Sequence, residues 1–369
     1  MSGYRIDGLG RHQSAQRVQF MVDGQAYSGF AGESLASALL ASGVTLFGRS
    51  FKYHRPRGLL GAGAEEPNAL VTVERGGGVF TPNLRATAVP IYEGLVARSQ
   101  NRWPSLKTDF GAVNDRLGRF FPAGFYNKTF MWPRSFWEKL YEPAIRRAAG
   151  LGALSGKHNE ELYEKAWAFC DLLVVGSGPA GLMAALAAGR AGAEVILAEE
   201  DAVFGGRLNG EVEEVGGRPG HLWASDVVAE LKAMPNVRLM ARTTVTGAYD
   251  GGTFGALERV GLHLANPPKS LPRECFWRIV ARRAILASGA QERQIAFPSN
   301  DRPGVMTASA VRTYLNRWGV ATGQKVAIFA NNDDAHRTAR DLAAAGLAIT
   351  AVIDVREDAP RGGDWPLFA

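Results

Sequence analysis

Residues 172–181 read Leu172-Leu173-Val174-Val175-Gly176-Ser177-Gly178-Pro179-Ala180-Gly181, and this stretch decides the fold of the chain. The four apolar residues predict a buried parallel strand. The glycines that follow have the Gly-x-Gly-x-x-Gly spacing and open a predicted helix, which indicates a Rossmann-type domain for the ADP half of a dinucleotide. Gly176 would allow the tight turn, Gly178 the approach of the pyrophosphate, and Gly181 the close packing of the helix on the strand.

The residues after this loop complete the expected nucleotide site. The helix is followed by a second apolar strand at 194–198, and Glu199 stands eighteen residues after Gly181. We expect Glu199, with Glu200 beside it, to accept hydrogen bonds from the adenosine ribose. The positive end of the helix, which begins at Pro179, and the N–H groups from Ala180 onward would face the phosphates. Two carboxylates would repel a 2′-phosphate, so the sequence favours NAD or FAD over NADP.

Three later segments favour the fold of a flavoprotein with two dinucleotide-binding domains. Gly205-Gly206-Arg207 would form a loop beside the pyrophosphate, and Val245, on a strand at 243–245, could meet the adenine. The apolar strand at 284–290 ends in small residues, including Gly289, which would let the chain pass close to the nucleotide. Each segment alone could equally be an ordinary strand or turn.

A second Rossmann-like unit is predicted from residue 325 onward. Strands at 325–329 and 349–353 flank a helix at 337–345, but the loop at 330–334 contains no glycine and includes Asp333 and Asp334. Because two acids stand where a phosphate would lie, we expect this unit to keep the Rossmann-like fold without binding a pyrophosphate.

The N-terminal part predicts a small β-grasp domain. Strands at 18–22 and 25–30 flank the turn Asp23-Gly24, a helix follows between Ser34 and Gly43, and another strand occupies 70–73. The connector after it holds Trp103, Trp132, Trp137 and Trp167, with short helices expected at 135–149. Such aromatic residues indicate packing either on a neighbouring domain or on a partner subunit.

We therefore expect an α/β chain of four parts. These are a β-grasp domain at 1–95, an aromatic connector at 96–168, a dinucleotide-binding domain at 169–322, and the truncated start of the glycine-poor unit at 323–369.

The net charge of +6 is mild, and no nucleic-acid-binding motif appears. Cys170 and Cys275 are far apart, which excludes a disulfide framework and any known zinc or iron–sulfur spacing. Without a signal peptide or a long apolar segment, we expect a cytoplasmic protein with no membrane contact.

Four stretches resemble the N-terminal part of the alpha subunits of heterotetrameric sarcosine oxidases. They are Arg55-Pro56-Arg57-Gly58 with 63–70, the aromatic segment 125–152, the glycine loop with Glu199-Glu200, and 287–293 running into 301–306. The resemblance implies non-covalent NAD, with FAD and FMN on a beta subunit or its junction with alpha, and smaller subunits besides. It also implies oxidation of the amine sarcosine to glycine and a one-carbon unit, with hydrogen peroxide formed, and a C-terminal folate-binding domain that this chain lacks.

The same resemblance implies NAD contacts at Ala180, Glu199, Glu200, Asp201, Arg207 and Val245. Arg207 stands where a small hydroxyl residue is expected, and Asp201 replaces a basic residue. Related dehydrogenase subunits carry clustered cysteines for a two-iron cluster around 61–70, where this chain has no thiol. We therefore expect a cluster-free β-grasp domain and no metal site.

No catalytic residue can be named from the sequence. His54, His158, His221 and His336 are expected at surface or packing positions, whereas the basic cluster Arg49, Lys52, Arg55 and Arg57 could meet a flavin phosphate, a beta subunit, or only solvent.

Two other functions compete with this one. They are an amino-acid or opine dehydrogenase subunit with FAD, and a non-catalytic module that holds a nucleotide. Because no segment after Asp354 returns to close the first dinucleotide domain, we expect a fragment or a truncated subunit of marginal stability.

Overall fold

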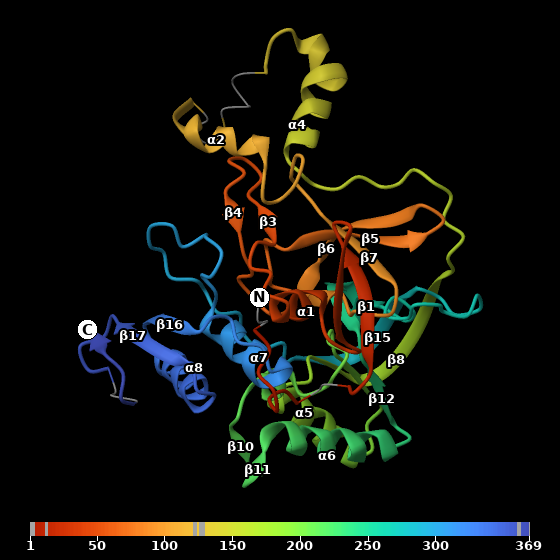
Figure 1. The fold of residues 1–369 in the computed structure, drawn as a ribbon. Coiled ribbons are helices and arrows are strands. Elements are labelled where there is room, and N and C mark those ends of the chain that lie inside the picture. The colour runs from red at the N-terminus through yellow and green to blue at the C-terminus, as the bar shows by residue number, and fades with distance from the viewer. Residues whose placement is uncertain (1–3, 12–13, 121–123, 125–129, 360–362, 369) are drawn as a thin grey trace.

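The computed structural model describes residues 4–11, 14–120, 124, 130–359 and 363–368, and it contains three sheets of more than two strands. The chain runs from the N-terminal sheet through a projecting arm to a six-stranded sheet and then to a small three-stranded sheet (Figure 1). Among the described residues, no helix is both long and apolar enough to cross a membrane.

The N-terminal domain is a mixed five-stranded sheet packed on one helix. Its strands are β1 (Arg17–Val22), β2 (Gln25–Phe30), β5 (Leu70–Gly76), β6 (Val79–Arg85) and β7 (Leu95–Ser99), in the order β2-β1-β7-β5-β6. β1 and β2 form the predicted hairpin, and β7 returns parallel to β1. Since β7 belongs to this sheet, the domain continues past the expected boundary at residue 95.

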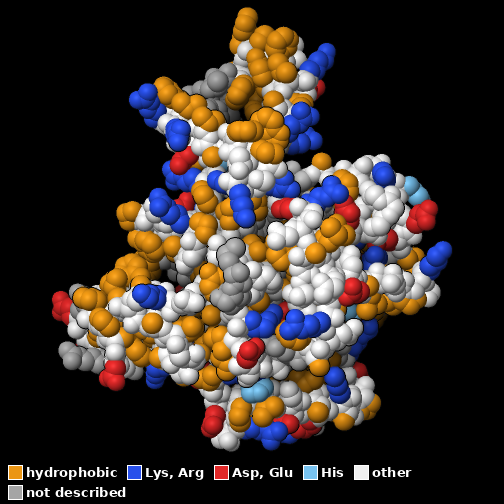
Figure 2. Space-filling model, viewed as in Figure 1, with side chains coloured by type: hydrophobic (Ala, Val, Ile, Leu, Met, Phe, Trp, Pro, Cys, Tyr) orange, Lys and Arg blue, Asp and Glu red, His pale blue; other side chains and the backbone are white. Residues whose placement is uncertain are grey.

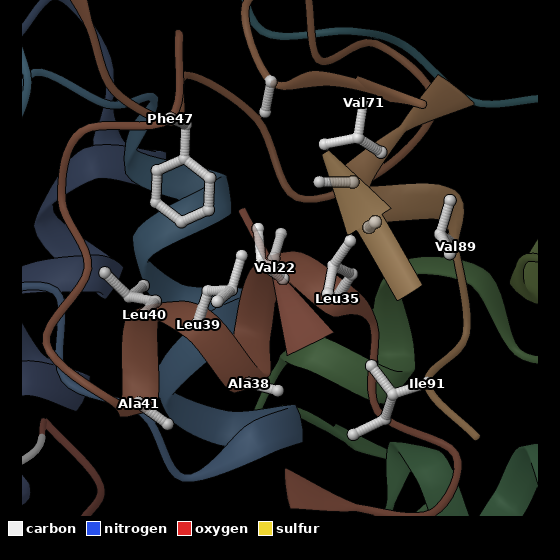
Figure 3. Close-up of a cluster of buried hydrophobic side chains, with 14 of the residues drawn as sticks. Val22, Leu35, Ala38, Leu39, Leu40, Ala41, Phe47, Val71, Val89 and Ile91 are labelled. Atoms are coloured by element: carbon white, nitrogen blue, oxygen red, sulfur yellow. The ribbon is translucent and has the colours of Figure 1, made fainter. Parts of the chain in front are cut away.

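The helix of this domain, α1 (Leu35–Ala41), is buried along its whole length. Ser34 caps it as predicted, because its side chain accepts a hydrogen bond from the Ser37 N–H. The leucines of α1 pack with Phe47, Val71 and Ile91 in the core under the sheet (Figure 3). A two-stranded ladder, β3 (Gly48–Arg49) with β4 (Pro56–Arg57), adjoins this core.

The connector forms an arm that projects from the body of the molecule (Figure 1). It contains α2 (Val113–Arg116), α4 (Glu142–Ala148) and short turns of helix, and residues 121–123 and 125–129 of the expected aromatic segment lie outside the described residues. Figure 2 shows apolar side chains gathered over the arm. Exposed apolar side chains of the described connector include Trp103, Phe110, Phe120, Met131 and Trp132.

The six-stranded sheet carries the predicted glycine loop. Its order is β12-β9-β8-β15-β14-β13, built from β8 (Tyr163–Val175), β9 (Val195–Ala198), β12 (Val237–Met240), β13 (Thr243–Tyr249), β14 (Thr253–Glu258) and β15 (Glu274–Leu286). β12, β9, β8 and β15 are parallel, whereas β13 and β14 form an antiparallel extension. β8 begins nine residues before the predicted strand at 172, inside the range expected for the connector.

Helices α5 (Pro179–Arg190) and α6 (Gly220–Ala233) pack with β8 and β9 in one apolar cluster. The small hairpin of β10 (Glu214–Val215) and β11 (Arg218–Pro219) precedes α6. The other helical segments of the described residues are short; they are η1 (Ala86–Ala88), η2 (Phe110–Ala112), η3 (Gly118–Phe120), η4 (Arg134–Phe136), η5 (Trp137–Tyr141), η6 (Gly206–Gly210) and η7 (Asp250–Gly252).

The last unit has the predicted strand–helix–strand order. β16 (Lys325–Ala330), β17 (Ala348–Asp354) and β18 (Leu367–Phe368) form a parallel sheet beside α8 (Asp333–Ala344). α7 (Ala308–Trp318) joins this unit to the N-terminal domain. Tyr314 and Trp318 enter the N-terminal core, whereas Leu315 packs with α8 and β16, so one helix fixes the two parts together.

Candidate dinucleotide site

The glycine loop between β8 and α5 has the geometry that its spacing predicts. Gly176 has φ +95°, and a Cβ there would lie 2.6 Å from the carbonyl oxygen of Ala287. A Cβ on Gly181 would overlap the carbonyl oxygen of Gly176. A Cβ on Gly178 would meet no described atom within 4 Å. Gly176 and Gly181 are therefore required by the turn itself, whereas Gly178 faces open space.

The amino end of α5 opens onto this space. Gly178 is the residue before the helix and Pro179 occupies its first turn, which contains no acidic side chain. The helix therefore presents Ala180 and its unpaired N–H groups without an internal carboxylate to neutralise them. This arrangement suits an anionic group such as a pyrophosphate.

Glu199 lies behind the loop rather than in the open space. Its side chain is buried; Oε2 accepts hydrogen bonds from the N–H of Ser177 at 2.9 Å and from its hydroxyl at 2.5 Å. Oε1 accepts from the Asp201 N–H at 2.9 Å. Glu199 thus holds the loop to the end of β9, and its carboxylate is already bonded on both oxygens.

Glu200 is the more accessible of the two carboxylates. Its side chain lines a pocket between the six-stranded sheet and the N-terminal domain. Burial raises the pKa of Glu200, the charge of Glu199 adds to this, and Arg259 opposes it. Of the two predicted ribose ligands, Glu200 therefore has the more accessible side chain.

Asp201 and Arg207, two further predicted nucleotide contacts, form ion pairs within the chain. Arg317 donates to both carboxylate oxygens of Asp201, one at 2.9 Å. Burial alone would raise the pKa of Asp201, but the hydrogen bonds and charge of Arg317 lower it. Arg207 pairs with Glu211 and, at 2.9 Å, with Asp334 of the last unit. Both departures from the family pattern thus serve internal ion pairs.

The other predicted segments lie beside the loop. The Gly205 N–H donates to the carbonyl oxygen of Ser177 at 3.1 Å, and a Cβ on Gly206 would lie 3.0 Å from the Cα of Gly178. β15 ends against the loop, where the Ala287 N–H donates to Val175 at 2.8 Å. Val245 lies half-buried on β13, and Gly289 follows β15 with φ +72°.

In the last unit, side chains of the chain itself occupy the loop between β16 and α8, the position that matches the glycine loop. Asn332 caps α8, and Asp333 and Asp334 occupy the first turn. Arg312, which is almost fully buried, donates to Asp334 at 3.0 Å, and Arg356 donates to Asp333 at 2.8 Å. The amino end of α8 is thus neutralised by carboxylates, as the acidic loop predicts.

The basic segment 49–57 is held by internal contacts as well. Arg49 donates to the carbonyl oxygens of Leu106 and His54, and His54 lies 2.6 Å from a buried carboxylate oxygen of Asp109. Arg55 pairs with Asp115 and Arg57 with Asp301. These contacts anchor the root of the arm, so the segment is more than a solvated loop. His336 is buried and bonded to Asp354 at 2.7 Å, a packing role.

Sequence reasoning missed one feature of this region. The pocket beside Glu200 is lined by Arg75, Arg242, Arg259 and His263, which come from separate segments. No local motif marks any of these residues. Only the packing of the N-terminal domain on the six-stranded sheet brings them together.

Two family models match parts of the chain. Residues 15–102 match a 2Fe-2S iron–sulfur cluster binding domain, and residues 171–248 match the FAD dependent oxidoreductases. The second match covers the glycine loop and Glu199-Glu200. It supports the prediction that this region has the fold of a dinucleotide-binding oxidoreductase.

The first match overturns the prediction of a cluster-free N-terminal domain, because it assigns this domain to a family that binds an iron–sulfur cluster. The matched residues contain no cysteine, which is the usual source of cluster ligands. In the loop before β5, Glu66 accepts the N–H groups of Leu60, Gly61, Asn68 and Ala69. The cysteine thiolates that usually bind such a cluster are thus absent from the matched residues. In the part of the chain that the structure describes, no three His, Cys, Asp or Glu side chains are grouped to hold a metal ion.

Relatives with long alignments confirm the resemblance seen in the sequence. The chain is 56% identical to the sarcosine oxidase subunit alpha of Rhizobium meliloti (strain 1021) over 96% of its own length and 36% of that protein. It is 37% identical to the subunit of the same name from Corynebacterium sp. (strain P-1) over 94% of its length and 31% of that protein. The chain thus spans about a third of the length of these curated relatives.

A solved structure has the same fold over most of the chain. It is the L-proline dehydrogenase from P. horikoshii, with a TM-score of 0.61 and 20% sequence identity over 95% of this chain and 56% of that one. The likeness supports an α/β fold.

Proposed function

We propose, on the premise that the chain is homologous to sarcosine oxidase alpha subunits over nearly its whole length, that it is the nucleotide-binding part of such a subunit. The observation that carries the proposal is the glycine loop, where Gly178 and the amino end of α5 face open space. The pyrophosphate of NAD would lie there, bound without a covalent link. Glu200 would accept the ribose hydroxyls, and Val245 and Gly289 would lie along the nucleotide.

A flavin-bearing beta subunit would supply the redox chemistry, in which sarcosine is oxidised to glycine and a one-carbon unit while molecular oxygen is reduced to hydrogen peroxide. This chain's own part would be to bind NAD and to hold the partner chains, among them the smaller subunits. The name "subunit alpha" of both relatives supports an assembly of several chains. No residue of this chain is assigned a catalytic step.

The arm is the surface that we assign to the beta subunit. Trp132 is 83% exposed and Trp103 68%, values more typical of an interface than of a free surface. Basic residues lie among these aromatics, including Arg116, Arg119 and Arg147. A partner surface with an apolar centre and an acidic rim would complement the arm.

The proposal also includes a β-grasp fold for the N-terminal domain and two dinucleotide-binding domains after it. The hairpin, α1 and the parallel return of β7 support a β-grasp domain, which here extends to about residue 99. The order of β8, β9, β12 and β15, with the unit after residue 323, supports the two-dinucleotide plan. Two buried free cysteines agree with a reducing, cytoplasmic location.

Release and identification of the bound nucleotide tests this proposal. The chain would be purified, denatured by heat, and the released ligand identified by chromatography and mass; we expect NAD at about one equivalent. Recovery of no nucleotide, together with no binding of added NAD, would refute the proposed site.

FAD in the same site is a second candidate function, favoured by the match of residues 171–248 to FAD dependent oxidoreductases. Release of FAD instead of NAD would support it and point to an amino-acid or opine dehydrogenase type of subunit. A further assay measures hydrogen peroxide from sarcosine when FAD, FMN and NAD are supplied to this chain alone. Turnover there would contradict the need for a flavin-bearing partner.

A further inference from the structure

Helix α7 meets a third part of the molecule besides the two that it joins. Two of its faces pack on the N-terminal core and on the last unit. A further face carries Arg312 and Asn316, which lie four residues apart and are therefore neighbours on the helix surface. This face meets the segment 205–211, which includes η6 and lies beside the glycine loop.

The segment 205–211 forms one side of the space before α5. The N–H of Gly205 donates to the carbonyl oxygen of Ser177 at 3.1 Å and to its hydroxyl oxygen at 3.0 Å. A Cβ on Gly206 would lie 3.0 Å from the Cα of Gly178. A shift of this segment would therefore change the space in which the pyrophosphate is proposed to lie.

Arg312 connects this segment to the last unit. Its side chain is almost fully buried, and its Nη2 lies 3.2 Å from a carboxylate oxygen of Glu211 and 3.0 and 3.1 Å from the two of Asp334. Arg207 pairs with the same two carboxylates, so two arginines balance two acids. Separating the segment from α8 would leave a buried charge without its partner, which is unfavourable, so this network holds the segment in place.

The acidity of the two carboxylates depends on the same arginines. Burial would raise the pKa of Asp334, but the hydrogen bonds and charges of Arg312 and Arg207 lower it. Burial raises the pKa of Glu211, and the charges of Arg207 and Arg312 oppose this shift. The bridge therefore joins one carboxylate from each unit through shared arginines.

Asn316 makes a second bridge one turn further along α7. Its side-chain amide donates to the carbonyl oxygen of Gly210 at 3.0 Å and to the carboxylate of Asp341 on α8 at 2.7 Å. Gly210 approaches α7 so closely that a Cβ there would lie 2.7 Å from Oγ1 and 3.1 Å from the Cα of Thr313. Two side chains of one helix face thus connect the same segment to α8.

We propose that Arg312 is a positioning residue of the nucleotide site, which holds the segment 205–211 against the glycine loop and makes nucleotide affinity depend on the last unit. This role rests on the proposed function, because it takes the space before α5 as the place of the pyrophosphate. Arg312 acts through Glu211 and not by touching the nucleotide. Asp334, which lies in the first turn of α8, anchors the same arginine. The unit with the acidic loop thereby supports the unit with the glycine loop.

Calorimetric titration of the full chain with NAD tests this role, at a temperature well below the melting temperature of each variant. Arg312→Gln should bind NAD about tenfold more weakly than the wild type. Arg312→Lys should recover most of this loss, because one ammonium group can replace the single nitrogen that makes these contacts. Glu211→Gln removes the charge at the other end of the bridge and should also weaken NAD binding, which keeps the test valid if Arg312→Gln does not fold.

Tyr314→Phe is the matched control on the same helix. It removes a buried hydroxyl that donates to the Gly61 carbonyl oxygen at 3.2 Å, on the face that packs on the N-terminal core. It should lower the melting temperature and leave NAD affinity unchanged. Unchanged affinity in both Arg312→Gln and Glu211→Gln, or an equal loss in Tyr314→Phe, would overturn the proposal.

Amide hydrogen exchange without nucleotide distinguishes a failure of this role from a failure of the proposed function. In Arg312→Gln, the amides of residues 205–211 should exchange at least about tenfold faster than in the wild type, whereas those of β1 should not change. Unchanged exchange at 205–211 would overturn the positioning role even if NAD binds. If the wild type bound no nucleotide, faster exchange would still support the hold of Arg312 on the segment, and the proposed function alone would fail.

Discussion

The two Rossmann-like units of this chain share a strand–loop–helix–strand order and differ in what occupies the loop. After β8, the loop carries three glycines and Gly178 faces open space. After β16, the corresponding position holds Asp333 and Asp334, which are bonded to Arg356 and Arg312. The same topology therefore leaves the loop open in one unit and fills it with ion pairs in the other.

The physical cause of this difference is the partner of the helix dipole. An α-helix offers unpaired N–H groups at its amino end, and some anion or acceptor must satisfy them. In α8 the caps are Asn332 and the aspartates of the first turn. In α5 no side chain of the helix does so, which leaves the role to a ligand. Topology thus sets the position of a site, and the loop residues decide whether it is available.

The largest expected effect comes from closing the open loop. Gly178→Val places a branched side chain where the pyrophosphate would lie, and the backbone there, with φ −62°, accepts any residue. NAD binding should weaken by at least about 100-fold in calorimetry, with the melting temperature unchanged. Asn331→Val, at the matching loop of the other unit, should leave NAD binding intact. Stoichiometric NAD or FAD in Gly178→Val would show that the nucleotide lies elsewhere.

The second prediction concerns the last unit, where Arg356 links Asp354 to Asp333. Asp354 is fully buried and accepts hydrogen bonds from Arg356 and His336. Asp354→Asn should lower the melting temperature by about 2–6 °C while NAD binding stays the same. Thermal unfolding of both proteins at neutral pH measures this. A loss of NAD binding without a loss of stability would mean that the last unit also serves the nucleotide.

The same carboxylate predicts an acid limit. Hydrogen bonds from Arg356, opposed by burial and aided by His336, hold the pKa of Asp354 well below its ordinary value of 3.8. Its stabilising contribution is therefore complete above about pH 4 and is lost as the pH falls through the lowered pKa. Below pH 4 the wild type should lose stability more steeply than Asp354→Asn. Parallel curves for the two proteins would contradict this origin.

A smaller effect is expected at the ribose end of the open site. Glu200→Ala should weaken NAD binding by about tenfold, the lower end of the range for one lost hydrogen bond to a charged group. It should weaken NADP less, or strengthen it, because a negative charge is removed. Glu194→Ala, at the other end of β9, is the control. Equal losses for both nucleotides would show that Glu200 does not contact the ribose.

The smallest effect concerns the two thiols. Cys170 and Cys275 are buried in the six-stranded sheet, and burial raises the pKa of Cys170 to about 11. The native chain should therefore react negligibly with a thiol reagent at pH 8, and both thiols should react after unfolding. Because the last unit has no cysteine, this reaction reports on the sheet of the open site alone. Rapid reaction in the native state would indicate that the sheet opens locally.

The N-terminal domain gives a different lesson about prediction. Its strands, its helix and the cap at Ser34 could be read from the sequence, because they depend on neighbouring residues. The prediction that the domain is cluster-free was drawn from the missing thiols in one loop, and the family match corrected it. Ligand residues in a single loop are thus a poorer guide to family than the pattern of the whole domain.

The sequence alone determined the glycine loop, the order of the elements and the closed loop of the last unit, because each depends on spacing over a few residues. Tertiary structure alone decided that Glu199 turns toward Ser177, that Arg207 and Asp201 form internal ion pairs, and that β8 begins at Tyr163. It also created the arginine-lined pocket between the domains. A side chain's partner from a distant segment is set by how the layers pack, and no local pattern encodes that choice.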